Sequence, residues 1–381
     1  MSEADIANDA IERLEWSDSK SPQTPQSAAR AMTRRSALRG GAAVLAGVTA
    51  GSLAACGSGS SSKAASTSGA SLGDIASIFG KSQKKYHFVF VNHVTTNPFF
   101  TPTQYGIADA ANLFGVTTQW TGSETGNVAQ MVTAFNTAIA AGADGIACPF
   151  IDPTAFNAPT ANALAKGIPV LSYNADEPNT RLAYIGQDLL ASGEAMGTHI
   201  KGLLPGGGDV AIFISQPGAA NVQPRLTGAQ NVLKGTNINV KSVDAGAVTA
   251  AGLSVIESFW NSHTSYKGLF AVDGGDTQSV GQTVQKYGLT KKGVKAGGFD
   301  LTPITQTELA SGNLEFTIDQ QPYLQGFLPV LEFFLYHASD GLSGIADVDT
   351  GLKFLNKTTV GPYNSTKSRY EGTSTSAGVS K

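Results

Sequence analysis

From about Tyr86 onward, the sequence alternates short β-branched or aromatic runs with amphipathic stretches, and this repetition limits the possible folds more than any other feature. Alternating strands and crossover helices predict parallel sheets with right-handed connections. The clearest helical stretch repeats apolar residues at spacings of three and four, at Val128, Met131, Val132, Phe135 and Ile139. The expected strands span residues 86–92, 116–120, 145–149, 169–173, 182–185, 209–215, 239–243, 268–273, 294–299 and 315–319.

So many strands exceed one ordinary sheet, and we predict an α/β chain with two doubly wound parallel-sheet lobes that divide near Gly186. Ligands of such sheets bind beyond the carboxyl ends of the strands. The segments after the expected strands are rich in Asn, Asp, Gln and Arg, with aromatic residues nearby. Such polar groups suit hydroxyls, and aromatic rings pack on the C–H faces of a sugar.

Composition and motifs exclude several classes of protein. The net charge of −3 provides no broad basic surface, so we expect no nucleic-acid partner. The sequence has no G-x-S-x-G, H-E-x-x-H, C-x-x-C or phosphate-loop motif, and its histidines are scattered without metal-ligand spacing. We therefore expect neither catalysis nor a metal or cofactor. Cys148, at the end of an apolar strand, is expected to be a buried small hydrophobe.

Residues 33–56 have the layout of a bacterial export signal: basic residues, a small-residue apolar run, and a cysteine. Arg34 and Arg35 resemble a twin-arginine motif, with Ala37 where phenylalanine is commoner. Cys56 follows Leu-Ala-Ala and resembles the acylated cysteine of a lipobox. The alternative is a short transmembrane anchor, which the length and the Gly and Ala content of the apolar run disfavour.

These features predict the organisation of the first part of the chain. We expect an export signal over residues 1–55, with Met32 as a second candidate start of translation. Residues 56–83 are rich in Gly, Ser and Ala and are expected to form a flexible tether to the lipid. The protein would then be exported and held by its lipid on the outer face of the bacterial cytoplasmic membrane, or in the periplasm.

The body also carries a series of short motifs in a recognisable order. From about residue 84 to 340 it resembles the type I periplasmic sugar-binding proteins of ABC importers, the group that includes ribose- and galactose-binding proteins. The motifs are NPFF at 97–100, AGADGI at 141–146, KGIPV at 166–170, LAYIGQD at 182–188, QPGAAN at 216–221, Arg225 with Gly228, GGFD at 297–300 and TIDQQP at 317–322.

The resemblance implies two lobes joined by a hinge of three crossings that close over one small ligand. The N-terminal lobe would comprise residues 84–186 and 321–345, and the C-terminal lobe residues 187–320 and 346–370, followed by a frayed tail at 371–381. The expected ligand is a monosaccharide or polyol, which a monomeric protein delivers to an ABC permease.

The resemblance also implies ligand-binding residues in the N-terminal lobe. Asn97 matches a position that binds sugar hydroxyls, and Phe99 and Phe100 match stacking aromatics; the alternative is a helix-start turn with a core aromatic pair. Asn174 falls where relatives place an aspartate, and Ala175 where several place an arginine. Without that arginine a bidentate clamp is lost, and we expect Asp176 or Tyr173 to compensate.

In the C-terminal lobe, Arg225 matches an arginine that donates to ligand oxygens; the alternative is a surface salt bridge. Asp273 and Asp300 end strands where relatives present Asn or Asp, and Gln320 matches a glutamine beside the hinge. An aspartate at a strand end can also cap the following helix, the role we expect for Asp276.

Other functions remain open from the sequence. The same fold can serve a sensor, in which binding of a sugar or a furanone signal is passed to a receptor partner. A transcription regulator is disfavoured by the export signal and by the lack of a basic helix-turn-helix before Tyr86. An enzyme would need paired carboxylates, for which Asp273 and Asp300 are the candidates.

Overall fold

The computed structural model describes residues 84–342 and 344–365. The predicted export signal, with Arg34 and Arg35, and the tether with its Cys56 lie outside the described residues, as does the tail from 366. Within the described residues, none of the helices combines the length and apolar character needed to cross a membrane.

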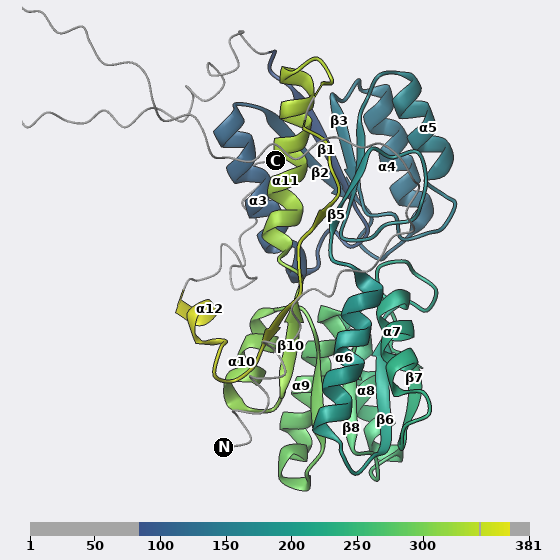
Figure 1. The fold of residues 1–381 in the computed structure, drawn as a ribbon, viewed down its shortest axis with the longest axis vertical. Helices are drawn as coiled ribbons and strands as arrows, with labels where there is room; N and C mark the ends of the chain where they lie inside the picture. Colours follow the sequence, from purple (N-terminus) through teal and green to yellow (C-terminus); the bar gives the residue numbers. More distant parts are fainter. Residues whose placement is uncertain (1–83, 343, 366–381) are drawn as a thin grey trace, which may run out of the picture. The chain divides into compact units, whose positions relative to one another are not determined.

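The described residues form two six-stranded sheets (Figure 1). The first has the order β11-β5-β4-β3-β1-β2 and the second β12-β10-β9-β8-β6-β7. Neighbouring strands are parallel except β10 and β12. The first sheet comprises β1 (His87–Asn92), β2 (Thr117–Gly122), β3 (Gly145–Cys148), β4 (Val170–Tyr173), β5 (Ala183–Gly186) and β11 (Val348–Asp349). The second comprises β6 (Gly208–Ile214), β7 (Ile238–Asp244), β8 (Gly268–Ala271), β9 (Lys295–Phe299), β10 (Phe316–Asp319) and β12 (Lys353–Leu355).

The α/β class with two parallel-sheet lobes is thus confirmed, and every expected strand is present with its ends shifted by two residues or fewer. The short strands β11 and β12 were not expected. Each has three residues or fewer, too few to show a period of two in the sequence.

Helices connect the strands and cover both faces of each sheet. Asn127 and Asp188 start α4 and α6 by accepting hydrogen bonds from backbone N–H groups three residues on. The first lobe contains η2 (Pro98–Phe100), α3 (Thr101–Phe114), α4 (Val128–Ala140), α5 (Asn157–Ala165) and α11 (Pro322–Ala338). The second contains α6 (Leu189–Leu203), α7 (Gln223–Leu233), α8 (Thr249–Ser262), α9 (Gly274–Tyr287), η3 (Leu289–Lys292) and α10 (Pro303–Ser311), and α12 (Gly361–Ser365) follows β12.

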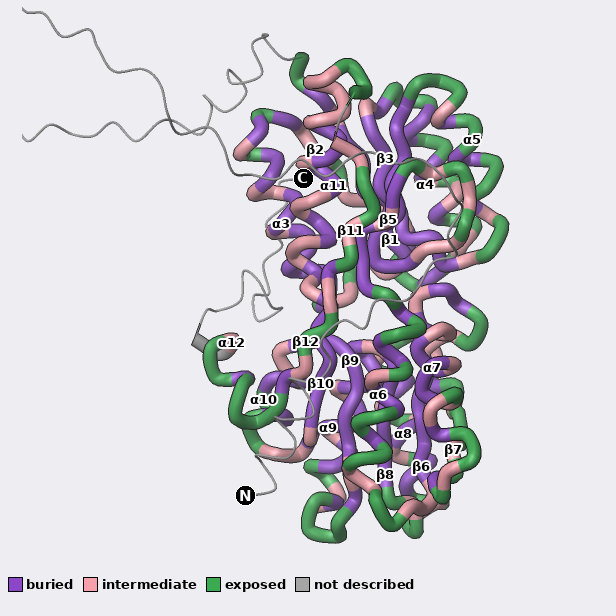
Figure 2. Tube along the Cα trace, viewed as in Figure 1, coloured by how far each residue is buried: buried purple, intermediate pink, exposed green. Residues whose placement is uncertain are grey.

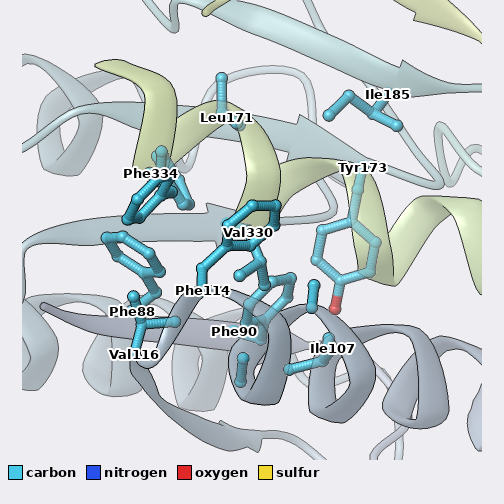
Figure 3. Packing of buried hydrophobic residues seen from close by; sticks show 14 of the residues in the cluster. Phe88, Phe90, Ile107, Phe114, Val116, Leu171, Tyr173, Ile185, Val330 and Phe334 are labelled. Carbon is cyan, nitrogen blue, oxygen red and sulfur yellow. The ribbon is translucent and has the colours of Figure 1, made fainter. Parts of the chain in front are cut away.

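Side-chain alternation along β1 divides the core of the first lobe into two layers. Phe88 and Phe90 pack with α3 and α11, in the cluster that Figure 3 shows around Val330 and Phe334. Val89 and Val91 point to the opposite face and pack with residues of α4 and α5. The central strands β1, β3 and β4 are consequently buried on both faces. Figure 2 shows β1 and β3 as purple, buried segments.

The second lobe repeats this division. Val210 and Ile212 of β6 pack with residues of α6 and α7. Ala211 and Phe213 face the cluster that includes residues of α8 and α9. Because both sheets are covered on both faces, polar side chains can meet a ligand only at the strand ends.

Two pairs of helices approach each other through glycines. In α3 and α11, a Cβ atom added at Gly106 would lie 2.2 Å from the carbonyl oxygen of Tyr323, and one at Gly326 would lie 2.0 Å from that of Thr103. In α6 and α7, a Cβ at Gly193 would lie 2.2 Å from the carbonyl oxygen of Arg225. Backbones this close leave no room for a larger residue.

The chain passes between the two sheets three times, at residues 187–188, 320–321 and 350–352. The last passage lies further along the chain than the predicted boundary at 345/346, because Val348 and Asp349 pair with Ile185 and Gly186 of the first sheet. Two side-chain hydrogen bonds connect the passages: Gln187 Nε2 donates to the Gly351 carbonyl at 2.9 Å, and Thr350 Oγ1 donates to the Gln320 carbonyl at 2.7 Å. The third passage is therefore held by both of the others.

Candidate ligand-binding site

A pocket with about 640 Å³ of empty space, its open mouth included, lies at the carboxyl ends of strands from both sheets. All the predicted ligand-binding residues except Asp176 line it. These are Asn97, Phe99, Phe100, Asn174, Arg225, Asp273, Asp300 and Gln320. Their role in binding remains a prediction, but the fold gathers them around one space.

The structure places Asp176 elsewhere. Its carboxylate pairs with the Arg181 guanidinium and accepts a hydrogen bond from Ser172 Oγ at 2.6 Å, so its oxygens are engaged away from the pocket. Tyr173 is also directed away, since its hydroxyl accepts from Asn92 Nδ2 at 2.8 Å within the core. Ala175 is fully buried among apolar residues. Neither Asp176 nor Tyr173 therefore compensates for the missing arginine clamp.

The segment after β1 forms the helix-start turn and the core aromatic pair considered for it, and it also lines the pocket. Asn97 Oδ1 accepts from the Phe99 backbone N–H at 3.0 Å and so starts η2. Phe99 and Phe100 meet edge to face with ring centroids 4.7 Å apart, and both belong to the first core while lining the pocket. The rings of Phe100 and His93 are also perpendicular, with centroids 5.2 Å apart. Core packing thus fixes the aromatic wall of the pocket.

A chain of amides runs through the pocket from the first sheet to the second. Asn174 Nδ2 donates to Gln320 Oε1 at 3.2 Å, and Gln320 Nε2 donates to Asp300 Oδ1 at 2.7 Å. Asn174 and Asp300 both have positive φ angles, 63° and 69°, which turn the chain sharply at the strand ends. The second hinge passage therefore connects polar groups of both lobes.

Arg225 is buried, with 2% of its surface exposed, so it does not form a surface salt bridge. Its guanidinium lies over the Phe299 ring, 4.2 Å from the centroid. Nη1 donates to the Val272 carbonyl and Nη2 to Gln187 Oε1, both at 3.1 Å. The guanidinium is thereby held rigidly between the second sheet and the first hinge passage.

Several buried atoms on the pocket walls have no hydrogen-bond partner among the described residues. They are His93 Nδ1, Arg225 Nε, Asp273 Oδ2 and Asp276 Oδ2. An unsatisfied buried polar atom costs about 1–3 kcal/mol. The walls of this one space therefore carry polar atoms that are available to a polar molecule.

The protonation of His93 follows from its surroundings. Burial lowers the pKa of its imidazole to about 4, so the ring is neutral at neutral pH. Its Nε2 lies 3.3 Å from Asn221 Nδ2, which can only donate, so the ring proton is on Nδ1. His93 therefore presents a free N–H donor, and its contact with Asn221 joins the two lobes across the pocket.

A model of the periplasmic binding protein domain matches residues 88–331 of this chain. The chain belongs to the periplasmic binding protein family. It is 48% identical over 305 residues to the xylose/arabinose-binding protein XylF of Sulfolobus acidocaldarius, covering 76% of this chain and 75% of that protein. The family and this relative are solute-binding proteins rather than enzymes.

Solved structures of ABC-transporter solute-binding proteins share this fold. One, from Burkholderia graminis in complex with D-arabinose, is 27% identical and has a TM-score of 0.69, covering 74% of this chain and 99% of its own. Another, a carbohydrate transporter of Acidothermus cellulolyticus in complex with myo-inositol, is 25% identical with a TM-score of 0.67, covering 76% of this chain and 100% of its own.

Some residues that line the pocket of this periplasmic binding protein were not predicted from the sequence to belong to the site. Asp273, not Asp276, caps α9, because its Oδ1 accepts from the Asp276 backbone N–H at 3.0 Å. Asp276 instead lines the pocket from the first turn of that helix. Thr249 and Asn221 line it from segments that follow β7 and β6. Their position after strand ends was the available signal, but it does not show which side chains turn inward.

Asp300 gives this binding protein a pH-dependent stability. Burial raises its pKa to about 6 although the Arg225 guanidinium opposes the shift, whereas unfolded aspartate titrates near ~3.9. Because the pKa of Asp300 is higher in the folded than in the unfolded protein, this residue contributes to the free energy of unfolding. Its contribution is fully present below pH ~4 and is lost as the pH rises through about 6. Asp300→Asn cannot ionise and can still accept from Gln320.

We expect Asp300→Asn to raise the free energy of unfolding of the unliganded protein by about 2 kcal/mol at pH 7.5, and by little at pH 4. Denaturant unfolding at both pH values measures this difference. An equal gain in the free energy of unfolding at both pH values, or no gain at pH 7.5, would contradict the conclusion that Asp300 is a buried carboxyl that ionises.

Proposed function

We propose that this periplasmic binding protein captures a monosaccharide or a small polyol outside the cytoplasm and delivers it to an ABC permease. The observation that carries the proposal is the set of unpartnered buried atoms in the pocket. Two are N–H groups, on His93 and Arg225, and two are carboxyl oxygens, on Asp273 and Asp276. Hydroxyl groups can both donate and accept, so adjacent hydroxyls of one sugar satisfy all of these atoms.

The relatives support the same ligand class. XylF is named for xylose and arabinose, and the related structures contain D-arabinose and myo-inositol. These are small, uncharged, polyhydroxylated molecules. We therefore place pentoses first among the candidate ligands and cyclic polyols second.

Capture would proceed by closure of the two lobes around the ligand. In the structure the lobes already touch: the Ala220 N–H donates to the Ile151 carbonyl at 3.1 Å, and His93 meets Asn221 at the pocket. A ligand that contacts both lobes favours this closed form over an open one. The permease would recognise the closed form.

Isothermal titration of the full-length chain with D-xylose, L-arabinose, D-arabinose, D-glucose and myo-inositol tests the proposal. We expect at least one of them to bind with a micromolar or lower dissociation constant. Thermal unfolding provides a second readout, because a ligand at a thousand times its dissociation constant adds about 4 kcal/mol of stability. Failure of every sugar and polyol to bind at millimolar concentration would refute the function.

We further propose that the protein is an exported, monomeric lipoprotein, acylated at Cys56 and directed by Arg34 and Arg35. Cys56→Ser is expected to move the protein from the membrane fraction to the soluble fraction, because the chain would lose its lipid. Cell fractionation followed by immunoblotting measures this. Cys148→Ala, which alters a buried cysteine of the folded body, is the control and should leave the distribution unchanged. Membrane association of Cys56→Ser would refute the lipid anchor.

A further inference from the structure

Gln187 is a buried glutamine of the first hinge passage, with 2% of its surface exposed. It is not among the residues that line the ligand pocket. Its Oε1 accepts a hydrogen bond from Arg225 Nη2 at 3.1 Å, while its Nε2 donates to the Gly351 carbonyl at 2.9 Å. The amide therefore joins an arginine of the pocket wall to the third hinge passage.

The two partners determine which way this amide points. A guanidinium can only donate and a backbone carbonyl can only accept, so the amide oxygen faces Arg225 and the nitrogen faces Gly351. The backbone is held as well, because the Tyr184 hydroxyl donates to the Gln187 carbonyl at 3.0 Å. A Cβ atom added at Gly186 would lie 2.2 Å from that hydroxyl oxygen. These contacts leave the Gln187 side chain one orientation.

Two hydrogen bonds and one aromatic ring determine how the Arg225 guanidinium lies. Nη1 donates to the Val272 carbonyl and Nη2 to Gln187 Oε1, and the group lies over the Phe299 ring. Because the guanidinium is planar and rigid, two anchored nitrogens fix the direction of the third. Nε, the third nitrogen, has no partner among the described residues. With Val272 as its one hydrogen-bond partner the group could turn about that contact, and Nε would lose its fixed place on the pocket wall.

From Gln187 a chain of hydrogen bonds runs through all three hinge passages. Gln187 donates to the carbonyl of Gly351, which follows Thr350 in the third passage. Thr350 Oγ1 donates to the carbonyl of Gln320 in the second passage at 2.7 Å. Gln320 Nε2 in turn donates to Asp300 Oδ1 at 2.7 Å, on the pocket wall. The chain of contacts thus leaves the pocket wall at one residue and returns to it at another.

We propose that Gln187 is a positioning residue for ligand binding, which acts through Arg225. Its oxygen holds the guanidinium so that Nε is aimed at a ligand oxygen, and its nitrogen ties this arrangement to the third hinge passage. The affinity for the ligand then depends on a side chain that does not touch the ligand. This inference rests on the proposed function, because it requires a ligand that Arg225 contacts.

The first test replaces the Gln187 amide in the full-length chain. Gln187→Met has a side chain of similar length and loses both hydrogen bonds, so we expect it to weaken binding about tenfold. Gln187→Glu keeps an oxygen for Arg225 but loses the donor to Gly351, and its affinity should stay within about threefold of wild type. Isothermal titration with the tightest-binding ligand of the panel above measures both effects, and denaturant unfolding checks that the variants fold.

A double-mutant cycle distinguishes positioning from a merely structural role in the hinge. If Gln187 acts through Arg225, Gln187→Met should change affinity by less than about twofold in a chain that already carries Arg225→Ala. Gln325→Met is the matched control, because Gln325 is also a buried glutamine beside the hinge. Gln325 Nε2 donates to the Gln320 carbonyl at 3.1 Å, and none of the hydrogen bonds of Gln325 involves Arg225. Its effect should be the same with and without Arg225→Ala.

The outcomes separate this inference from the function. If wild type binds a sugar or polyol and a folded Gln187→Met binds it equally well, the positioning role is wrong and the function stands. A loss of affinity that persists in the presence of Arg225→Ala would also overturn the role, because the effect would not pass through the arginine.

Two further results would count against the positioning role. If Gln187→Met does not fold, a loss of about tenfold or more in Gln187→Glu would overturn it, since that variant keeps the acceptor for Arg225. Disappearance of the Gln325→Met effect in the Arg225→Ala chain would overturn it as well, because the coupling would not be specific to Gln187. If wild type binds no sugar or polyol, the function and the positioning role fail together.

Discussion

Replacing Arg225 by alanine is expected to weaken sugar binding about a hundredfold, a loss of about 3 kcal/mol. The guanidinium is buried against Phe299 and has an unpartnered Nε on the pocket wall. Its removal deletes a charge-assisted donor to the ligand and leaves the buried Asp300 without the cation that favours its ionised form. Titration calorimetry with the sugar bound by wild type measures the effect.

Two further variants serve as controls. Arg225→Lys keeps the charge but loses the planar fork that reaches Val272 and Gln187 together, so we expect an intermediate loss of affinity. Arg181→Ala removes a different arginine, which is only partly buried and pairs with Asp176 and Asp347 outside the pocket, and should leave affinity within twofold. Equal affinities of Arg225→Ala and wild type would show that Arg225 does not contact the ligand.

Gly326→Ala is expected to lower the free energy of unfolding by about 3 kcal/mol, at the upper end of overpacking effects. The new methyl group would lie 2.0 Å from the Thr103 carbonyl oxygen, and backbone cannot move aside as a flexible side chain can. The helices α3 and α11, which lie side by side against the first sheet in Figure 1, would have to separate. That separation would loosen the packing of Val330 and Phe334 in the cluster of Figure 3.

Gly202→Ala is the matched control, since it is also a helical glycine but its added Cβ would contact nothing within 4 Å. We expect this change to be neutral or to stabilise by up to ~1 kcal/mol, because alanine favours helix more than glycine does. Denaturant unfolding of both variants measures the difference. Similar stabilities of the two would show that the α3–α11 contact tolerates separation.

The repeating pattern of the sequence is sufficient to predict the two sheets. Side-chain alternation and helical spacing are local properties, and they located each of the longer strands before any contact was known. The same logic placed Asn97, Asn174, Arg225 and Asp300 after strand ends, where the fold gathers them. It failed for β11, because a strand of two residues is too short to show the alternation of apolar and polar side chains.

Hydrogen-bond partners were decided by the tertiary structure. Asp176 was expected in the pocket, but Arg181, which follows in the same loop, occupies its carboxylate. Asp273 caps α9 in place of Asp276, because the geometry of the turn determines which carboxyl meets the first N–H groups of the helix. Residue types and strand periodicity lie in the sequence itself, whereas the partner of a buried polar atom depends on where distant segments meet, as Gln187 and Arg225 do.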